Sequence, residues 1–347
     1  MNRRWICADV WLDILPSFDR PQLGLKMALL SDRFDVLVDK HFDGKKTELT
    51  IWREIRIRKD KGPEPKLSVR IDDNLVEFPL PDRPLPNKIR FKDLQIYFID
   101  RSVIEFLRSN KQIWDRKGTN LELSIANVQP IWDVFSRQIW PIFATNIRHL
   151  SIVGHIHLDN FRRLISPTIL SDLDHLNAIN SGLLFRDVIA DDGPNATAGQ
   201  ALYKWLHTPS KNGQPKQLRC RDYSNPPNLE WINNFKEAFL RATTSSSYII
   251  QLIFYTIPTP TGPFELVNER TNEKLIMWEK SKCNWLLKRC PIIVGETATI
   301  QWKDENWDDN LNNVKFNLWR GINTIGPLSS PAEEEKEEAD KSNQNYI

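Results

Sequence analysis

The stretch LELSIANVQPIWDVFSRQIWPIFATNIRHLSIVG, Leu121–Gly154, contains two hydrophobic periodicities. Residues 121–127 and 147–154 have the composition of short strands, whereas residues 130–144 repeat apolar side chains at helical spacing. A strand, a helix and a second strand in this order are typical of a parallel α/β unit. This stretch therefore predicts an α/β architecture.

The same order recurs on both sides of this stretch. The expected strands are 94–99, 175–180, 216–223 and 247–257, and the expected helices are 102–114, 158–173, 197–207 and 228–242. A strand-helix unit has one apolar face, which stacking against a neighbouring unit would cover. The pattern predicts strand-helix repeats over residues 101–257. Trp132, Trp140 and Phe143 on the helix 130–144 are predicted to be core residues that cover the sheet.

The flanking regions are richer in strand patterns. Residues 43–100 contain alternating stretches such as TELTIWREIRIRKD, and the proline-dense FPLPDRPLPN (Phe78–Asn87) cannot continue a central strand. Residues 258–326 contain a hairpin pattern, FELVNERTNEKLIMWEK, followed by NWLLKRCPI, ATIQW (298–302) and VKFNLW. The acidic end, 327–347, has few apolar groups and is predicted to be disordered.

The stretch REIRIRKDKGPEPK, Arg53–Lys66, is the most basic part of the chain. Its composition fits either a segment that attracts nucleic acid or an exposed edge strand that charge protects from pairing. We favour the edge strand. The acidic end of the chain could also mask this stretch.

The overall composition excludes several classes of protein. Lys and Arg total 47 against 45 Asp and Glu, so the net charge gives no reason to expect nucleic acid or a membrane as partner. We find no run of 18 apolar residues, and Asp9 and Asp13 interrupt the apolar N-terminus that a signal peptide would need. Four scattered cysteines indicate reduced thiols and a cytoplasmic or nuclear protein.

The sequence contains no strong catalytic or ligand-binding motif. His155 and His157 could join Cys220 or Asp159 at a metal ion, but a further ligand at diagnostic spacing is missing. The loop DDGPNATAG, Asp191–Gly199, lacks the Gly-Lys-Ser/Thr of a phosphate-binding loop, and GxSxG does not occur. We therefore predict that the chain is not an enzyme and holds no cofactor or metal.

The N-terminal residues 6–42 read as three short helices. The first repeats apolar residues at steps of three and four, the second begins near Pro21, and the third is capped by Ser31 or Asp32. About forty residues bury too little surface to form an independent domain. The helices therefore form either half of an interface or a cap over the first strands.

Residues 6–39 resemble an F-box, with Cys7 where that family usually has proline. The matching residues are Ile6, Asp9, Val10, Trp11, Leu12, Ile14, Leu15 and Phe18, followed by Gln22-Leu23, Ala28-Leu29-Leu30-Ser31, Arg33-Phe34 and Leu37-Val38. The remainder is similar to the expanded nematode F-box proteins, through FELVNERTNEKLIMWEK with NWLLKRCP and through PDRPLPNKIRFKDLQI. Proteins of this family are substrate receptors of Skp–cullin–F-box ubiquitin ligases.

The resemblance implies a three-part chain of mixed α+β and α/β class. A three-helix F-box (1–42) would precede a leucine-rich-repeat-like substrate-recognition domain (43–326) and a disordered tail (327–347). The implied adaptor-binding residues are Ile6, Val10, Trp11, Ile14, Leu15, Phe18, Leu23, Leu29 and Phe34.

The implied partners are a Skp-type adaptor, the cullin and RING subunits behind it, and an unknown target protein. The target would bind loops at one edge of the repeat sheet. Neither a membrane nor nucleic acid is an expected partner. A repeat-type scaffold that acts without ubiquitin is the alternative, and a secreted form of the same receptor is a third interpretation.

Overall fold

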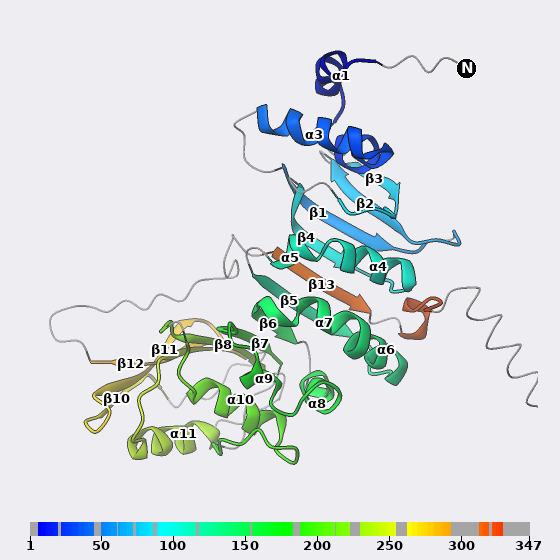
Figure 1. Ribbon diagram of the computed structural model, residues 1–347. Helices are drawn as coiled ribbons and strands as arrows, with labels where there is room; N and C mark the ends of the chain where they lie inside the picture. Colours follow the sequence, from blue (N-terminus) through cyan, green and yellow to red (C-terminus); the bar gives the residue numbers. More distant parts are fainter. Residues whose placement is uncertain are drawn as a thin grey trace, which may run out of the picture. The chain divides into compact units, whose positions relative to one another are not determined.

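The computed structural model describes residues 6–19, 22–44, 50–60, 62–71, 74–85, 89–115, 118–152, 155–182, 188–211, 213–222, 230–254, 262–292, 312–318 and 321–328. The chain divides into two compact units (Figure 1). Unit 1 comprises residues 1–117, 128–143 and 312–347, and unit 2 comprises residues 118–127 and 144–311. Each unit combines helices with a mixed sheet, so the predicted mixture of α and β structure is confirmed.

The sheet of unit 1 has the strand order β13-β4-β1-β2-β3. Its strands are β1 (Thr50–Arg58), β2 (Lys66–Ile71), β3 (Asn74–Pro79), β4 (Ile89–Ile96) and β13 (Asn312–Leu318). β13, β4 and β1 are parallel, whereas β2 and β3 are antiparallel to their neighbours. The last strand of the described residues therefore pairs with β4, which lies in the first hundred residues.

Strand β1 lies inside this sheet and not at its edge. It pairs with β4 on one side and β2 on the other, so the prediction of an exposed edge strand at Arg53–Lys66 is wrong. Ile55 and Ile57 are buried, while Arg56 and Arg58 point to the opposite, polar face. The charges that suggested an edge belong to the polar side of an alternating inner strand. The edge is β3, which ends at Pro79.

The N-terminal part of unit 1 is helical. It contains α1 (Ala8–Ile14), the 3₁₀ turn η1 (Leu15–Ser17), the π-helical turn η2 (Leu23–Met27), the 3₁₀ turn η3 (Ala28–Leu30) and α3 (Asp32–Gly44). Three helical segments are therefore present over 6–42, although the middle one is irregular. Figure 1 shows α1 and α3 near the β3 end of this sheet.

Asn110 interrupts the helix predicted at 102–114. The chain forms α4 (Arg101–Ser109) and then α5 (Lys111–Asp115). The fully buried Asn110 side chain donates to the Phe106 carbonyl and accepts from the Leu85 amide, each at 2.8 Å. Asn110 therefore ties the helix break to the proline-dense segment after β3, a contact that helical periodicity cannot reveal.

The helix predicted at 130–144 packs on β13. It consists of α6 (Gln129–Val134), the π-helical turn η4 (Phe135–Ile139) and α7 (Trp140–Phe143). Trp132, Trp140 and Phe143 are buried, which confirms their predicted core role. The rings of Phe135 and Phe143 meet the Phe316 ring of β13 edge to face, at centroid distances of 5.4 and 5.8 Å. Unit 1 also contains η6 (Gly321–Thr324).

Unit 2 contains five parallel strands in sequential order. These are β5 (Thr119–Ile125), β6 (Ile147–Ile152), β7 (Ala178–Ser181), β8 (Lys216–Asp222) and β9 (Tyr248–Phe254). Antiparallel strands β12 (Asn284–Pro291), β11 (Glu273–Ser281) and β10 (Phe264–Asn268) then extend the sheet beyond β9. The predicted hairpin at β10–β11 is confirmed, whereas the strand predicted at ATIQW (298–302) lies outside the described residues.

The helices of unit 2 form one layer on one face of this sheet. They are α8 (His155–Leu164), α9 (Ile169–Asp172), α10 (Ala198–His207) and α11 (Glu230–Arg241), with the short turn η5 (Ala144–Asn146) before β6. Parallel strands in sequential order, joined by right-handed crossovers, place their helices on the same face. Contacts of α10 with both α8 and α9 agree with this, as does Figure 1. The predicted helix 158–173 is divided before α9, near Pro167.

The core of unit 2 lies between the helices and one face of the parallel strands. Leu121, Leu150, Ile179, Leu218 and Ile250 occupy matching positions across this face and have no exposed surface. The opposite face of the same strands carries polar side chains that are mostly half-buried.

Candidate functional site

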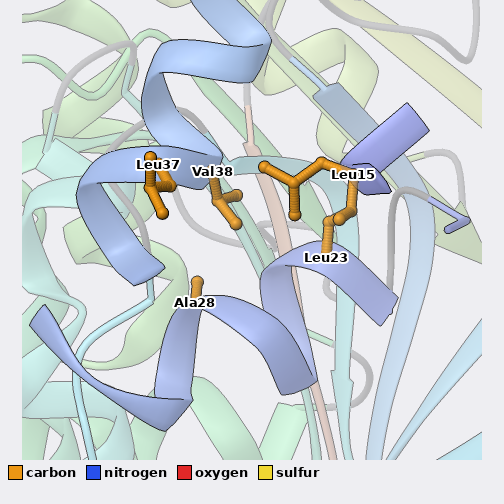
Figure 2. Packing of buried hydrophobic residues seen from close by; sticks show 5 residues of the cluster. All are labelled: Leu15, Leu23, Ala28, Leu37 and Val38. Atoms are coloured by element: carbon orange, nitrogen blue, oxygen red, sulfur yellow. The ribbon is translucent and has the colours of Figure 1, made fainter. Parts of the chain in front are cut away.

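The N-terminal helical segment (residues 6–44) has a small core of its own. Leu15, Leu23, Ala28, Leu37 and Val38 form one buried cluster and point toward one another in Figure 2. They come from η1, η2, η3 and α3, so every helical part of the segment except α1 contributes a buried side chain. The cluster fixes the positions of these short helices relative to each other.

Helix α1 is attached to this core through one of its faces. Trp11 packs against the cluster and meets the Phe34 ring of α3 edge to face at 4.8 Å. Arg33 donates from its guanidinium to the carbonyl oxygen of Ile6 at 2.5 Å. These contacts hold the start of the chain against α3.

The other face of α1 carries an exposed apolar stripe of Ile6, Val10 and Ile14. Their exposed fractions are 46%, 44% and 38%. The three residues are four apart, so Val10 and Ile14 lie one above the other on the helix and Ile6 precedes them. We call these three residues the apolar stripe. Leu30 and Val36, which the sequence did not predict as site residues, are also exposed.

The nine predicted adaptor-binding residues therefore occupy three environments. Ile6, Val10 and Ile14 are exposed, and Leu15 and Leu23 are buried in the cluster. The remaining four, Trp11, Phe18, Leu29 and Phe34, are half-buried. Only the exposed and half-buried side chains offer surface to a partner, because Leu15 and Leu23 are covered by the segment itself.

The helical segment also contacts the sheet of unit 1. The ammonium group of Lys26 lies 5.4 Å from the centroid of the Phe78 ring on β3. Asp32 at the start of α3 pairs with Arg83 at 3.2 Å. Both contacts lie on parts of the segment other than α1, so the apolar stripe is not used for them.

A second group of polar side chains lies on the face of the unit 2 sheet opposite its described helices. We call it the polar face and define it by Glu122, Ser151, Asn180, Arg219, Arg221, Gln251 and Asn284, from β5, β6, β7, β8, β9 and β12. The first four of these strands place Glu122, Ser151, Asn180 and Arg219 in register, and Gln251 follows on β9. The sequence signal is a polar residue between two aliphatic ones in successive strands, as in LEL, LSI and IQL.

Hydrogen bonds connect these side chains across the strands. Asn180 donates to the Ser151 hydroxyl at 3.1 Å and accepts from Arg221 at 3.4 Å. Gln251 accepts from Arg219 Nε at 2.7 Å and donates to Asn284 at 3.1 Å. Arg219 and Gln251 are 5% and 3% exposed, so these hydrogen bonds satisfy polar groups that are largely buried.

A buried polar cluster lies on the opposite, helix-covered side of unit 2. Arg289 and Glu273 form an ion pair at 2.6 Å, with 2% and 1% of their side chains exposed. Arg289 also donates to the Thr244 carbonyl, and Glu273 accepts from the Ser246 amide. The pair thus holds the chain before β9 against β11 and β12, which is a structural role.

His207 lies in the same region. Its Nδ1 is 2.9 Å from the Tyr203 carbonyl oxygen, its Nε2 is 3.2 Å from the Tyr248 hydroxyl, and its ring stacks on Tyr203 at 4.0 Å. Burial lowers the pKa of His207 to about 4. The ring is therefore neutral at physiological pH, with Nδ1 donating to the carbonyl and Nε2 accepting from Tyr248.

Burial also lowers the pKa of Lys216, to about 8. Its ammonium group donates to the Trp205 carbonyl and lies 4.8 Å from the centroid of that indole ring. Both groups are enclosed by packed side chains, so their shifted pKa values reflect desolvation in the core.

The metal and nucleic-acid interpretations receive no support from the described residues. The side chains of His155 and His157 lie outside them, and Cys220 is buried in the core. Within the described part of the chain, no three His, Cys, Asp or Glu side chains come together as a metal site. Arg56 and Arg58, from the basic stretch, pair with Glu54 and Glu77.

Among the helices described, none is both long enough and apolar enough to span a bilayer. Comparisons with protein-family models, with curated proteins and with solved structures give no match to this chain.

Proposed function

We propose that the chain is the substrate-recognition subunit of a Skp–cullin–F-box ubiquitin ligase. The N-terminal helical segment would dock on a Skp-type adaptor, and residues 43–326 would hold a target protein. The apolar stripe carries this proposal, because α1 keeps Ile6, Val10 and Ile14 exposed while its opposite face packs on the segment core. Each apolar side chain that becomes fully buried in an interface contributes roughly 1.5–3 kcal/mol in gross terms.

The proposed activity requires no catalytic side chain in this chain. A receptor accelerates ubiquitin transfer by raising the effective concentration of the target near a ligase that other subunits supply. The sequential parallel strands and single helix layer of unit 2 suit a leucine-rich-repeat-like receptor, which presents a wide sheet surface to partners. Free thiols at Cys7, Cys220, Cys283 and Cys290 fit the reducing cytoplasm or nucleus, where such ligases act.

The test is co-purification of the full chain with a Skp-type adaptor, beside the double variant Val10→Asp, Ile14→Asp. We expect a stable complex with the wild type and a loss of about 100-fold or more in affinity for the variant. Leu15→Asp is unsuitable, because a charge at this fully buried position would unfold the segment itself.

The matched control is Leu240→Asp on α11. Leu240 is 46% exposed, close to the 44% of Val10, but lies in unit 2. This variant should bind the adaptor as the wild type does. Equal binding by wild type and double variant, with circular dichroism showing both folded, would contradict docking through the apolar stripe.

A second candidate function is a protein-interaction scaffold that acts without ubiquitin. It is favoured by the contacts of Lys26 with Phe78 on β3 and of Asp32 with Arg83, which follows β3. A segment that serves only as a cap would leave the chain unable to bind the adaptor. Absence of binding by the folded wild-type chain would therefore favour the scaffold.

A further inference from the structure

The last described residues of the chain are bound to the segment that follows β4. The Gly326 amide donates to the Ile99 carbonyl at 2.8 Å, and the Arg101 amide donates to the Pro327 carbonyl at 3.1 Å. Both bonds lie within unit 1. They fix the point on the surface of unit 1 from which the chain continues into residues 329–347.

Lys59, which follows β1, lies close to this point. Its ammonium group is 5.1 Å from the centroid of the Phe98 ring. A Cβ atom on Gly326 would come within 2.6 Å of Cζ of the same ring. One phenyl ring therefore separates Gly326 from Lys59. Lys59 is exposed, and within the described part of the chain no carboxylate pairs with it.

Two further cations lie beside Lys59. Arg58 precedes it on β1, and Lys66 of β2 is the register partner of Arg58. Their side chains are 32% and 47% exposed, and both bond Glu77, while Arg58 also pairs with Asp60 at 3.6 Å. These carboxylates offset the charges of Arg58 and Lys66 but not that of Lys59. We call Arg58, Lys59 and Lys66 the basic corner.

The sequence that follows the described residues has the opposite charge. Residues 333–340, EEEKEEAD, contain six carboxylates and one lysine. Glu333 is five residues beyond Leu328, and an extended chain covers about 3.3–3.6 Å per residue, so Glu333 can reach roughly 17 Å and Asp340 roughly 40 Å from Leu328. A segment attached so close to its binding site has an effective concentration in the millimolar range.

We propose that the acidic segment Glu333–Asp340 of this chain docks on the basic corner, with one of its carboxylates on Lys59. The occupant is a part of the same chain because the chain continues toward that segment one ring away from Lys59. The docked segment masks the corner, so a polyanion in solution has to displace it first. The contact lies within unit 1 and does not depend on docking to an adaptor.

The test is cross-linking of the full chain with a carbodiimide, which joins a lysine ammonium group to a carboxylate that touches it. Mass spectrometry should find Lys59 or Lys66 joined to a residue of 333–340. High salt should remove this product, because it screens contacts between exposed charges. The product of Lys66 with Glu77, which are 2.9 Å apart, shows that the reaction works.

Lys26 is the matched control lysine. It is exposed, belongs to unit 1, and lies 5.4 Å from the centroid of the Phe78 ring, as Lys59 does from that of Phe98. Lys26 lies on the helical segment beside β3, away from the end of β4. It should therefore form no product with residues 333–340.

A mixture of isotope-labelled and unlabelled chain identifies the occupant. Docking within one copy gives products that join labelled peptides to labelled ones and unlabelled to unlabelled. Products that join the two kinds would show that the segment of a second copy occupies the corner, and would overturn the proposal.

Masking is measured by binding of a heparin oligosaccharide to the full chain. The unmasked variant changes Glu333, Glu334, Glu335, Glu337 and Glu338 to Gln and Asp340 to Asn. We expect it to bind heparin about tenfold more tightly than the wild type. Adding Lys59→Gln to this variant should reverse most of the gain, whereas adding Lys26→Gln should leave it in place.

Two further results would overturn the proposal. One is the absence of any product between the basic corner and residues 333–340 in a sample that gives the product of Lys66 with Glu77. The other is equal binding of heparin by the wild type and the unmasked variant.

Discussion

Two buried polar sites of unit 2, the Arg289–Glu273 pair and His207, differ in the surroundings of their ionisable side chains. Arg289 and Glu273 lie against each other, and each also bonds the backbone. His207 is buried against Tyr203 and Tyr248, and desolvation lowers the pKa of its ring. Sequence alone could not predict these contacts, since the residues that make them come from α10, β9, β11 and β12.

The depressed pKa of His207 predicts how stability changes with pH. In the unfolded chain the ring titrates near its ordinary value of 6.5, and in the folded protein it titrates near 4. Between these values the unfolded state binds more protons, so unfolding becomes more favourable as pH falls. Stability that is fully present above pH 6.5 should decrease down to pH 4, by roughly 3 kcal/mol from this group.

The measurement is urea unfolding of the wild type and of His207→Gln at several pH values from neutral to 4. Glutamine can bond Tyr248 but does not titrate, so the pH dependence over this range should be clearly weaker in the variant. The neighbouring Tyr203 and Tyr248 have raised pKa values, and the pKa of Lys216 is about 8, so these groups keep their protons over most of this range. Identical slopes in both proteins would contradict a buried neutral histidine.

At the scale of elements, local patterns predicted strands better than helix ends. Alternation in β1 and the hairpin of β10–β11 depend on near neighbours, and both were confirmed. The break at Asn110 depends on the amide of Leu85, which is distant in sequence. The edge position assigned to Arg53–Lys66 failed because strand order is decided by pairing with β4 and β2 and not by charge.

The candidate sites, too, could be predicted from the sequence only where they depend on local patterns. Helical spacing identified the apolar residues of α1, but it could not separate the exposed Ile14 from the buried Leu15 that follows it. The side on which a residue lies depends on how α3 packs against α1. The polar face was missed because its members are single residues in different strands, and only the register across β5–β9 brings them together.

The loop before α10 gives a prediction at the scale of elements. Arg162 on α8 is buried and donates to the carbonyl oxygens of Pro167, Gly193 and Ala196. Removing the guanidinium takes this donor from all three carbonyls, although the Gly193 carbonyl still accepts from the Ala196 amide at 3.0 Å. We expect Arg162→Met to raise amide hydrogen exchange in residues 191–197, while the capping box of Thr197 and Gln200 keeps α10 itself protected.

Arg163→Met is the control for this loop. Arg163 is exposed and bonds Asn160, on its own helix, at 2.9 Å. Its loss should leave exchange in residues 191–197 unchanged. Similar exchange in the two variants would show that Arg162 does not hold the loop.

At the scale of the whole molecule, unit 1 depends on residues from both ends of the chain. Phe316 of β13 has no exposed surface and touches Phe135 and Phe143. Truncation of a buried phenylalanine typically costs about 3–5 kcal/mol. Phe316→Ala should therefore lower the free energy of unfolding of the chain by about that amount, as measured by chemical denaturation.

Asn317→Ala on the same strand is the comparison. Its side chain is half-exposed and points to the other face of β13, so the cost should be under about 1 kcal/mol. A small effect of Phe316→Ala would mean that β13 adds little to the core of unit 1.

The pairing of β13 with β4 also has a consequence for synthesis. Translation runs from the N-terminus at roughly 5–20 residues per second, so β4 waits on the order of ten to forty seconds for its partner strand to leave the ribosome. During that interval the edge of β4 is open and the rings of Phe135 and Phe143 lack the ring of Phe316. A nascent chain that stops before residue 312 would contain the helical segment, but the edge of β4 would remain unpaired. We expect such a chain to be bound by chaperones or degraded, because an unpaired strand edge promotes aggregation.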